Sequence, residues 1–341
     1  MSITAKEIAE KLGVSKQAVY SVLGDKPVCH VSREKKEKIL FLARAYHYRP
    51  NAAALHLNGK RTHRIGIVMD SYAGVNAMML CRLASRLAAE SYQLDAVSFT
   101  GVRQGLDAIS DFVSSGVDGI IYHRSYIPAE QAQIGIPSIA FGQEIEHDYA
   151  LGARLAAEHL IACHGHRKLL FVAFEPHTGH KYQGYCAALE DAGLEPLPQL
   201  HTIGNQDFEK QLRGYLKSGV TAIICLWPDQ MVYFLRMHGI RVPEDVAVVG
   251  FERGELKPGT ALVWTDKNRL GMRIGELILR KIREQDLHSL PPERIPPRFI
   301  PDLSCGCPGH KTSNFAFSYH VDDPFFTRGM GDESGGMRDE R

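Results

Sequence analysis

The segment TAKEIAEKLGVSKQAVYSVL, residues 4–23, predicts two short helices joined by a tight turn. Thr4 can cap the first helix through its hydroxyl, and Glu7, three positions later, completes a capping box. Gly13 can adopt the positive φ that ends a helix, and Ser15 can cap the next one. We therefore expect the chain to begin with a compact helical module.

The second of these helices has an apolar and a polar face. Its buried stripe would consist of Val19, Val22 and Leu23. The side chains left facing outward are Lys16, Gln17, Tyr20 and Ser21. A third helix from Ser32 would close a small core with Ile39, Leu42, Ala43 and Tyr46. A helix-turn-helix module places such outward side chains in the major groove of DNA; a helical hairpin used only for packing is the alternative.

The distribution of charge separates these two interpretations. Residues 1–64 hold thirteen Lys and Arg against five Asp and Glu, a net charge of +8, whereas the whole chain is only +1. Residues 65–341 carry 27 basic and 34 acidic side chains, a net charge of −7. A positive field concentrated on one small module is typical of nucleic-acid binding, so the balance favours a DNA-binding head.

The string Tyr48-Arg49-Pro50-Asn51 follows this module and carries a family resemblance. Together with the preceding helices it resembles the LacI/GalR family of bacterial regulators, and a looser similarity extends over residues 65 to about 307. The resemblance implies that the helix at 15–24 reads an operator and that a hinge leucine, Leu57, enters the minor groove. The small residues of the hinge are typical of a segment that folds only against DNA.

The chain departs from the family pattern at positions that read DNA. Most relatives have arginines where this chain has Ser21 and Leu55, and Tyr20 replaces a usual serine. A missing arginine removes a guanine contact worth about 1–3 kcal/mol, so we expect an unusual operator, with readout moved to Lys16, Gln17 and Tyr20. The residues assigned to DNA binding are Thr4, Ser15, Lys16, Gln17, Tyr20, Ser21, Asn51, Ala54 and Leu57.

Length and composition favour several units in a cytoplasmic protein. A chain of 341 residues suits a small head and two middle-sized lobes. The first ten residues do not resemble a signal peptide, and no apolar run approaches the roughly eighteen residues of a membrane span. Seven scattered cysteines favour reduced thiols over a disulfide framework.

Beyond Arg64, short apolar strands alternate with amphipathic helices, a pattern that predicts parallel sheets covered by helices. One set has strands at 65–69, 94–99, 119–122 and 138–141 and helices at 78–90 and 106–114. A second set has strands at 169–172, 222–225 and 246–249 and helices at 185–189 and 231–237. The family resemblance implies a type I periplasmic-binding-protein-like domain, whose chain crosses between two lobes three times.

The expected fold is an all-α helix-turn-helix head followed by an α/β two-lobe effector domain. The head would span 1–48, a hinge helix and linker 49–63, the effector-binding and dimerisation domain 64–307, and a disordered tail 308–341. Lobe one would take about 64–145 with a return segment near 268–285. Lobe two would take about 165–265 with a C-terminal strand.

Ligands of such sheets bind beyond the carboxyl ends of the strands, so we expect a small effector between the lobes. The candidates, from strand ends and from family positions that hold sugars or purines, are Tyr72, His123, Arg124, Asp148, Lys181, Phe208, Trp227, Asp229 and Glu252. Relatives usually have arginine, asparagine and aspartate where this chain has Lys181, Pro228 and Glu252. A sugar or sugar derivative is expected, but its identity does not transfer.

Two alternatives for these candidates stay open. Asp148 and Asp229 precede helical patterns and could serve as helix caps. Phe208 and Trp227 could stack on a sugar or belong to the core, since large aromatic side chains are mostly buried in any fold.

Histidines and cysteines recur in Cys163-His164-Gly165-His166, His177, His180 and Cys305-Gly306-Cys307. Structural zinc sites favour repeated ligand pairs two to four residues apart, so one Cys-x-Cys with distant partners predicts no metal site. The cysteine pair is then either a redox-sensitive spot or two ordinary thiols. The chain has no Gly-x-Ser-x-Gly, phosphate-binding loop or His-Glu-x-x-His motif, so no cofactor and no enzymatic activity are indicated.

The expected function is that of a repressor that binds a pseudo-palindromic operator as a homodimer or tetramer. Two copies of Leu57 would wedge into the minor groove, and closure of the lobes on an effector would change the hinge. Induction and corepression are both compatible with this scheme. The alternatives are a cytoplasmic small-molecule binding module or enzyme with a protein-binding head, and a regulator that has lost effector binding.

Overall fold

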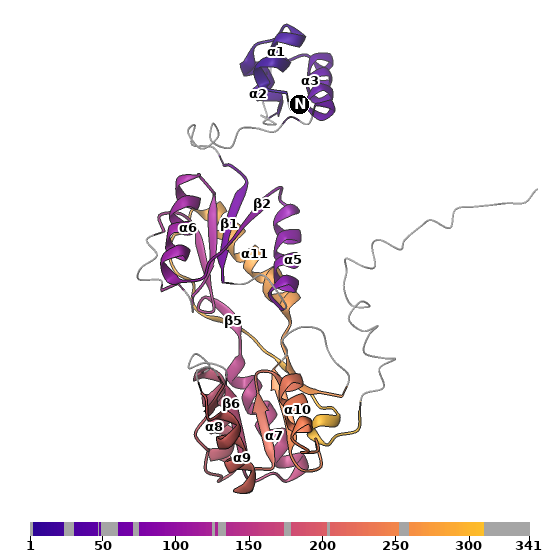
Figure 1. The fold of residues 1–341 in the computed structure, drawn as a ribbon. Coiled ribbons are helices and arrows are strands. Elements are labelled where there is room, and N and C mark those ends of the chain that lie inside the picture. Colours follow the sequence, from indigo (N-terminus) through magenta and orange to yellow (C-terminus); the bar gives the residue numbers. More distant parts are fainter. Residues whose placement is uncertain are drawn as a thin grey trace, which may run out of the picture.

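The protein consists of a helical head and two α/β lobes (Figure 1). The structure, a computed structural model, describes residues 3–23, 31–46, 48, 61–70, 75–124, 127–128, 134–173, 179–202, 205–251 and 259–309. Most of the hinge expected at 49–63 and of the tail expected at 308–341 lies outside these ranges. Among the described helices, none combines the length and apolar character needed to span a bilayer.

The head is built by the local signals that the sequence contains. Its helices are α1 (Ala5–Leu12), α2 (Lys16–Leu23) and α3 (Arg33–Ala45). The Thr4 hydroxyl accepts from the Glu7 amide at 3.2 Å, and the Glu7 carboxylate accepts from the Thr4 amide at 2.7 Å. Gly13 ends α1 with φ +60°. The Ser15 hydroxyl accepts from the Ala18 amide at 3.1 Å, which confirms the start of the second helix.

The core of the head closes around Ile8, Val19, Val22 and Ile39, all of which are buried. Tyr46, which the sequence analysis places in this core, is instead 42% exposed. The reason is that α3 ends at Ala45, so Tyr46 leaves the helical stripe, and its ring lies 5.7 Å from the Lys11 ammonium. Tyr48 packs against the core in its stead.

Lobe one is a six-stranded parallel sheet in the order β11-β5-β4-β3-β1-β2. Its strands are β1 (Arg64–Met69), β2 (Gln93–Ser98), β3 (Gly119–His123), β4 (Ser138–Phe141), β5 (Ile145–His147) and β11 (Glu293–Ile295). Its helices are α5 (Val75–Ala88), α6 (Val102–Ser114) and α11 (Lys267–Glu284). α11, at the expected return segment, packs against α5, where a Cβ on Gly271 would lie only 2.2 Å from the Met79 carbonyl oxygen.

Lobe two repeats this arrangement in the order β12-β10-β9-β8-β6-β7. Its strands are β6 (Leu169–Ala173), β7 (Leu200–His201), β8 (Ala222–Cys225), β9 (Ala247–Phe251), β10 (Ala261–Trp264) and an antiparallel edge strand, β12 (Arg298–Ile300). Its helices are α7 (Tyr149–His164), α8 (Gly179–Asp191), α9 (Phe208–Lys217), α10 (Pro228–Met237) and the 3₁₀ turn η2 (Leu303–Cys305). α7 follows Asp148, where a helical pattern was expected, and it packs against α8 and β10.

The chain passes from one lobe to the other three times: between β5 and α7, between β10 and α11, and between β11 and β12. The first passage runs from the end of β5 to the helices of the other lobe in Figure 1. Two of the passages end in a capped helix. Asp148 accepts from the Leu151 amide at 2.9 Å to start α7, and Asp266 accepts from the Arg269 amide at 2.8 Å to start α11.

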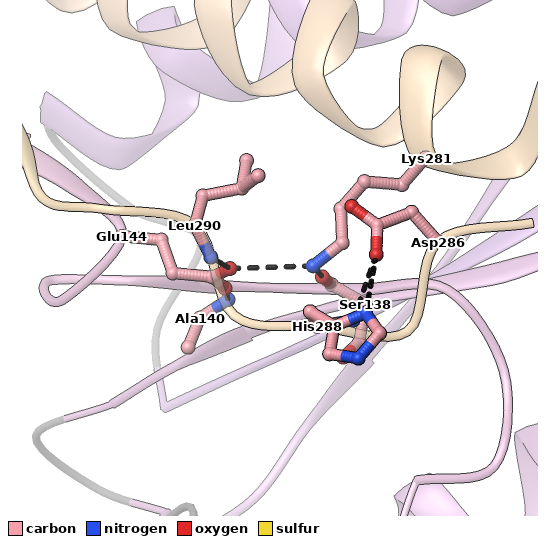
Figure 2. A network of polar contacts seen from close by, with 7 residues as sticks. All are labelled: Ser138, Ala140, Glu144, Lys281, Asp286, His288 and Leu290. Carbon is pink, nitrogen blue, oxygen red and sulfur yellow. Dashed lines mark hydrogen bonds and ion pairs between the residues drawn. The ribbon is translucent and has the colours of Figure 1, made fainter. Parts of the chain in front are cut away.

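Lobe one holds α11 to its sheet with a buried ion pair (Figure 2). Lys281 Nζ on α11 lies 3.3 Å from Glu144 Oε1 and donates to the Ser138 carbonyl at 2.7 Å. The two oxygens of Glu144 also accept from the backbone amides of Leu290 and Ala140, each at 2.6 Å. Lys281 is 1% exposed and Glu144 3%, so these hydrogen bonds take the place of water around the pair.

Candidate DNA interface and effector cleft

The helix α2 presents the polar face that the sequence predicts. Lys16, Gln17 and Tyr20 are exposed, and Ser21 is half-buried. Val19 and Val22 lie on the buried face of the same helix. Ion pairs of the head join residues four apart within α1 and α3, whereas α2 contains no acidic side chain that would repel a phosphate.

The remaining DNA-binding candidates fall into two groups. The hydroxyls of Thr4 and Ser15 are engaged in the caps that start α1 and α2, so their first role is to fix these helices. Asn51, Ala54 and Leu57 lie outside the described residues.

In lobe one, the candidates at the end of β3 lie beside β4. The His123 ring packs edge-on against Phe141, with the ring centroids 4.4 Å apart. Burial lowers the pKa of His123 to about 4 although the Asp70 carboxylate acts in the opposite direction, so the ring is neutral at neutral pH. Arg124 donates to the Gln143 side chain at 2.9 Å. Tyr72 lies outside the described residues.

In lobe two, Phe208 and Trp227 line one cavity of about 230 Å³. The cavity lies at the carboxyl ends of β6 and β8, and its other walls are Val172, Ala173, Thr202, Cys225, Leu226, Gln230, Met231 and Phe234. Phe208 also packs against Phe234, with the ring centroids 6.0 Å apart. Both aromatic side chains therefore line the cavity, and Phe208 also packs against the hydrophobic core.

The two aspartates among the candidates differ in their local role. Asp148 is the N-cap of α7, as one of the two alternatives expects. Asp229 lies in the first turn of α10 and accepts from the Thr260 hydroxyl at 3.3 Å, while the N-cap position there belongs to Trp227. Glu252 lies outside the described residues.

Four side chains gather where the chain passes between the lobes, and we call them the crossover cluster: His147, Tyr149, Lys181 and Lys267. Lys181 Nζ on α8 lies 3.9 Å from the centroid of the Tyr149 ring, and Lys267 Nζ on α11 lies 5.9 Å from it. The ammonium groups of both lysines act electrostatically on the Tyr149 hydroxyl. Lobe one contributes His147 and Lys267, and lobe two contributes Tyr149 and Lys181, so both lobes build this site.

Burial and the two ammonium groups together set the electrostatics of the crossover cluster. His147 is 1% exposed, and neither of its ring nitrogens has a hydrogen-bond partner in the part of the chain described. Burial, reinforced by Lys267 and Lys181, lowers its pKa to about 2. Burial raises the pKa of Tyr149, but the ammonium groups of Lys267 and Lys181 outweigh this effect, and the net pKa is lowered. The cluster therefore favours negative charge.

Of these four residues, only Lys181 is an effector-binding candidate from the sequence; His147, Tyr149 and Lys267 are not among the candidates. The usable signal was weak: His147 ends a strand of only three residues, and Lys267 follows an aspartate that caps a helix. Only the folded chain shows that these positions, 120 residues apart, meet.

A second group of side chains lies at the far end of α7. His159 and His164 from this helix meet Cys305 and Cys307 from the C-terminal segment, with all four potential ligand atoms within 4.8 Å of one another. We call this group the Cys-His cluster. The sequence analysis expected no metal site because about 140 residues separate the two pairs, a distance that spacing rules do not bridge.

A three-helix head joined to two lobes that share one strand order is the architecture of a helix-turn-helix module followed by a periplasmic-binding-protein-like domain. The family model of that description, periplasmic binding protein-like domain, matches residues 157–305. The helix-turn-helix head and two-lobe fold class predicted from the sequence are thereby confirmed.

Curated relatives extend the similarity over most of the chain. The repressor PurR of Mannheimia succiniciproducens is 24% identical over 318 residues, covering 83% of this chain and 93% of PurR. The regulator GntR of Escherichia coli K12 is 25% identical, covering 83% and 92%. Catabolite control protein A of Staphylococcus epidermidis is 23% identical, covering 75% and 84%.

Solved structures show the same fold. The Lac repressor dimer bound to operator and the anti-inducer ONPF superposes with a TM-score of 0.74 at 22% identity, covering 89% of this chain and 99% of that one. The complex of the regulator CelR with cellobiose gives a TM-score of 0.61 at 21% identity, with the same coverage. The chain is thus similar over most of its length to regulators of the LacI/GalR family.

Proposed function

We propose that this protein is a transcriptional repressor that binds operator DNA through α2 and responds to a small effector held between its lobes. The observation that carries the proposal is the polar face of α2, where Lys16, Gln17 and Tyr20 are exposed on a helix anchored by Val19 and Val22. We infer that the protein acts in the cytoplasm, where it meets DNA, and that it has no catalytic role.

The proposed mechanism requires a dimer, because one small head makes few contacts with DNA. Two heads would occupy the halves of a pseudo-palindrome, and two copies of Leu57 would meet in the minor groove at its centre. The relative whose structure contains operator DNA is a dimer, which supports this arrangement. Effector binding would then change operator affinity by changing how the lobes present the two hinges.

Selection of bound sequences from random duplexes tests the DNA-binding part. We expect one pseudo-palindromic sequence to be enriched, and its affinity to fall with salt at a log-log slope of about −0.9 per phosphate contacted. Repeating the selection with a metabolite extract present would report the sign of regulation. A protein that ignores duplex DNA at low salt would contradict the proposal.

A pair of lysine variants locates the interface. Lys16→Ala should weaken operator binding by about 1–3 kcal/mol and relax the preference at one base pair, because α2 would enter the groove. Lys6→Ala removes the same charge from α1, where Lys6 pairs with Glu10 at 3.8 Å, and should change operator affinity much less. Equal losses in the two variants would mean that only overall charge matters.

Leu57→Ala tests the hinge. The variant should lose operator affinity while the lobes keep their affinity for effector, because the leucine would contact only DNA. If Leu57→Ala binds the operator as tightly as the unmodified protein, the minor-groove wedge is wrong.

The crossover cluster refines the class of effector. Two ammonium groups, a tyrosine ring and a buried histidine lie together where the chain passes between the lobes, and the histidine has no hydrogen-bond partner among the described residues. The two ammonium groups act to lower the pKa values of both His147 and Tyr149, so the field in this cluster favours a negative charge. We therefore propose a sugar derivative that carries a carboxylate or a phosphate, whose charge the two lysines would balance.

Calorimetry with matched pairs of ligands tests this refinement. Sugar acids and sugar phosphates should bind more tightly than the neutral sugars from which they derive. Lys181→Ala should weaken the best acidic ligand roughly tenfold or more, whereas Lys217→Ala, an exposed lysine at the end of α9, should leave it unchanged. Tighter binding of neutral sugars would contradict the proposal of an acidic effector. If none of the ligands tested binds, the protein would be a regulator without an effector of this kind.

A further inference from the structure

The Cys-His cluster has the composition and the dimensions of a metal site. His159 and His164 come from the last turns of α7, and Cys305 and Cys307 flank Gly306 at the end of η2. Two thiolates and two imidazoles are the ligand set of structural zinc sites, and together they balance the charge of one Zn²⁺ ion. This cluster is not part of the crossover cluster or of the DNA interface.

Four of the six distances between the ligand atoms are close to the edges of a zinc tetrahedron, and all six are within 4.8 Å. With Zn–N near 2.0–2.1 Å and Zn–S near 2.3 Å, those edges should be about 3.3 Å between two nitrogens and about 3.6 Å between nitrogen and sulfur. The two Nε2 atoms of His159 and His164 lie 3.2 Å apart. The nitrogen to sulfur distances are 3.2 Å for His164 to Cys307, 3.4 Å for His159 to Cys307 and 3.6 Å for His159 to Cys305.

The cysteine segment is held in place by bonds that do not involve the ligand atoms. The Ser304 hydroxyl donates to the Val248 carbonyl at 2.7 Å and accepts from the Ala261 amide at 2.8 Å. The Asp302 carboxylate accepts from the Gly259 amide at 2.8 Å. Because these bonds fasten η2 to the sheet of lobe two, the thiols are positioned before any ion arrives.

Gly306 lets both thiols turn to the same side. Its φ is +96°, a conformation that favours glycine, and an added Cβ would lie 3.3 Å from Nδ1 of His164. The turn between the cysteines thus lies directly against one of the two imidazoles. Cys305 is 1% exposed, so water has little access to the sulfur.

We propose that His159, His164, Cys305 and Cys307 bind one zinc ion in a closed tetrahedral site. Four protein ligands leave no position for a substrate, so the role of the ion is structural. It joins the C-terminal end of α7 to the last described segment of lobe two. Binding deprotonates both thiols, and the two protons are released to solvent.

Metal analysis of the full chain, purified under reducing conditions and supplied with zinc chloride, tests the proposal. We expect one zinc per chain, and less than a tenth of that in the Cys305→Ser/Cys307→Ser double variant. Cys163→Ser is the matched control, because Cys163 precedes His164 in the chain but is exposed and outside the cluster; it should keep the full amount. Zinc absent from the unmodified protein, or retained by the double variant, would overturn the proposal.

Replacement of zinc by cobalt chloride identifies the ligands even if the double variant folds poorly. The cobalt protein should show the intense visible bands of tetrahedral cobalt and a thiolate-to-cobalt charge-transfer band in the near ultraviolet. Cys307→Ser, a milder change at the half-buried thiol, should lose about half of the charge-transfer intensity, since one of two thiolates remains. The weak spectrum of octahedral cobalt, or a loss of the bands in Cys163→Ser, would show that the assigned ligand set is wrong.

Discussion

The two lobes share one strand order but fasten their C-terminal parts with different chemistry. Lobe one holds α11 with the buried pair of Lys281 and Glu144, supported by backbone amides (Figure 2). Lobe two holds its last segment with hydrogen bonds from Ser304 and with the Cys-His cluster. The difference teaches that a single topology does not fix the interaction that closes it. The stability of a lobe held by an ion pair falls when one partner is removed. The stability of a lobe held by thiols and imidazoles depends on bound metal and on oxidation of the thiols.

The largest expected effect is on the ion pair of lobe one. Glu144→Ala should lower the free energy of unfolding by about 3–5 kcal/mol, because it leaves a buried ammonium and two buried amides without their acceptor. Lys281→Met should cost less, since Glu144 keeps both amide donors. Urea unfolding measures both, with Glu90→Ala, a more exposed glutamate of the same lobe, as the control. Equal losses for the two buried positions would contradict the assigned role of the amides.

Chelation of the metal should affect lobe two and leave lobe one unchanged. Removing metal from the reduced protein should speed amide hydrogen exchange on the order of tenfold or more at the end of α7 and in residues 300–309. Exchange around β4 and α11 in lobe one should stay unchanged. Hydrogen-exchange mass spectrometry with and without a zinc chelator measures this. A uniform change over both lobes would show that chelation acts on the whole protein.

Acid should weaken lobe one through its buried histidines. Folding lowers the pKa of His147 from 6.5 to about 2, so between these values the unfolded chain binds a proton that the folded chain does not. Stability is therefore complete above pH 6.5 and falls as the pH drops, by up to about 1.4 kcal/mol per pH unit. His123, with its pKa lowered to about 4, adds to the loss.

The variant His147→Leu removes this titration without leaving a polar group unsatisfied, since the ring nitrogens have no hydrogen-bond partner among the described residues. Urea unfolding at pH 7.5 and pH 5 should show a smaller loss in the variant than in the unmodified protein. Identical pH dependence in the two would mean that His147 is protonated in the folded state.

The smallest effects concern the two aspartates that cap helices after a lobe passage. Asp148→Ala and Asp266→Ala should each cost about 1 kcal/mol, because each leaves a helix amide without its acceptor. Asn at either position keeps the cap and should restore stability. If Asp148 also contacts the effector, Asp148→Asn should change effector affinity while Asp266→Asn does not. Calorimetry beside thermal unfolding separates the two roles.

Local signals made the head predictable from the sequence. Thr4, Gly13 and Ser15 act within a few residues of themselves, and the structure has the expected caps. Strands of lobe one and lobe two were found where apolar runs are long. The three-residue strands β5 and β11 were not predicted, because such short segments carry no periodicity and their place depends on the partner strand. A C-terminal strand was expected in lobe two without bounds, and β12 lies there.

The sites between distant segments were predictable only in part. Lys181 and Asp148 could be named from the resemblance, but their neighbours His147 and Lys267 come from separate passages of the chain. The Cys-His cluster was even less predictable from the sequence. The sequence shows one pair near residue 160 and another near residue 305, and only the packing of η2 beside α7 reveals that they meet. Distance in the chain, rather than unusual chemistry, hid both sites.

The three passages between the lobes also set an order of assembly during translation. A ribosome delivers the first five strands of lobe two before it delivers α11 and β11, which complete the sheet and core of lobe one. Lobe one therefore stays incomplete, with the face that packs against α11 exposed, until most of lobe two has been synthesised. A nascent chain arrested before residue 267 would carry a finished DNA-binding head on an unfinished sensor, so premature termination there yields a product open to proteolysis.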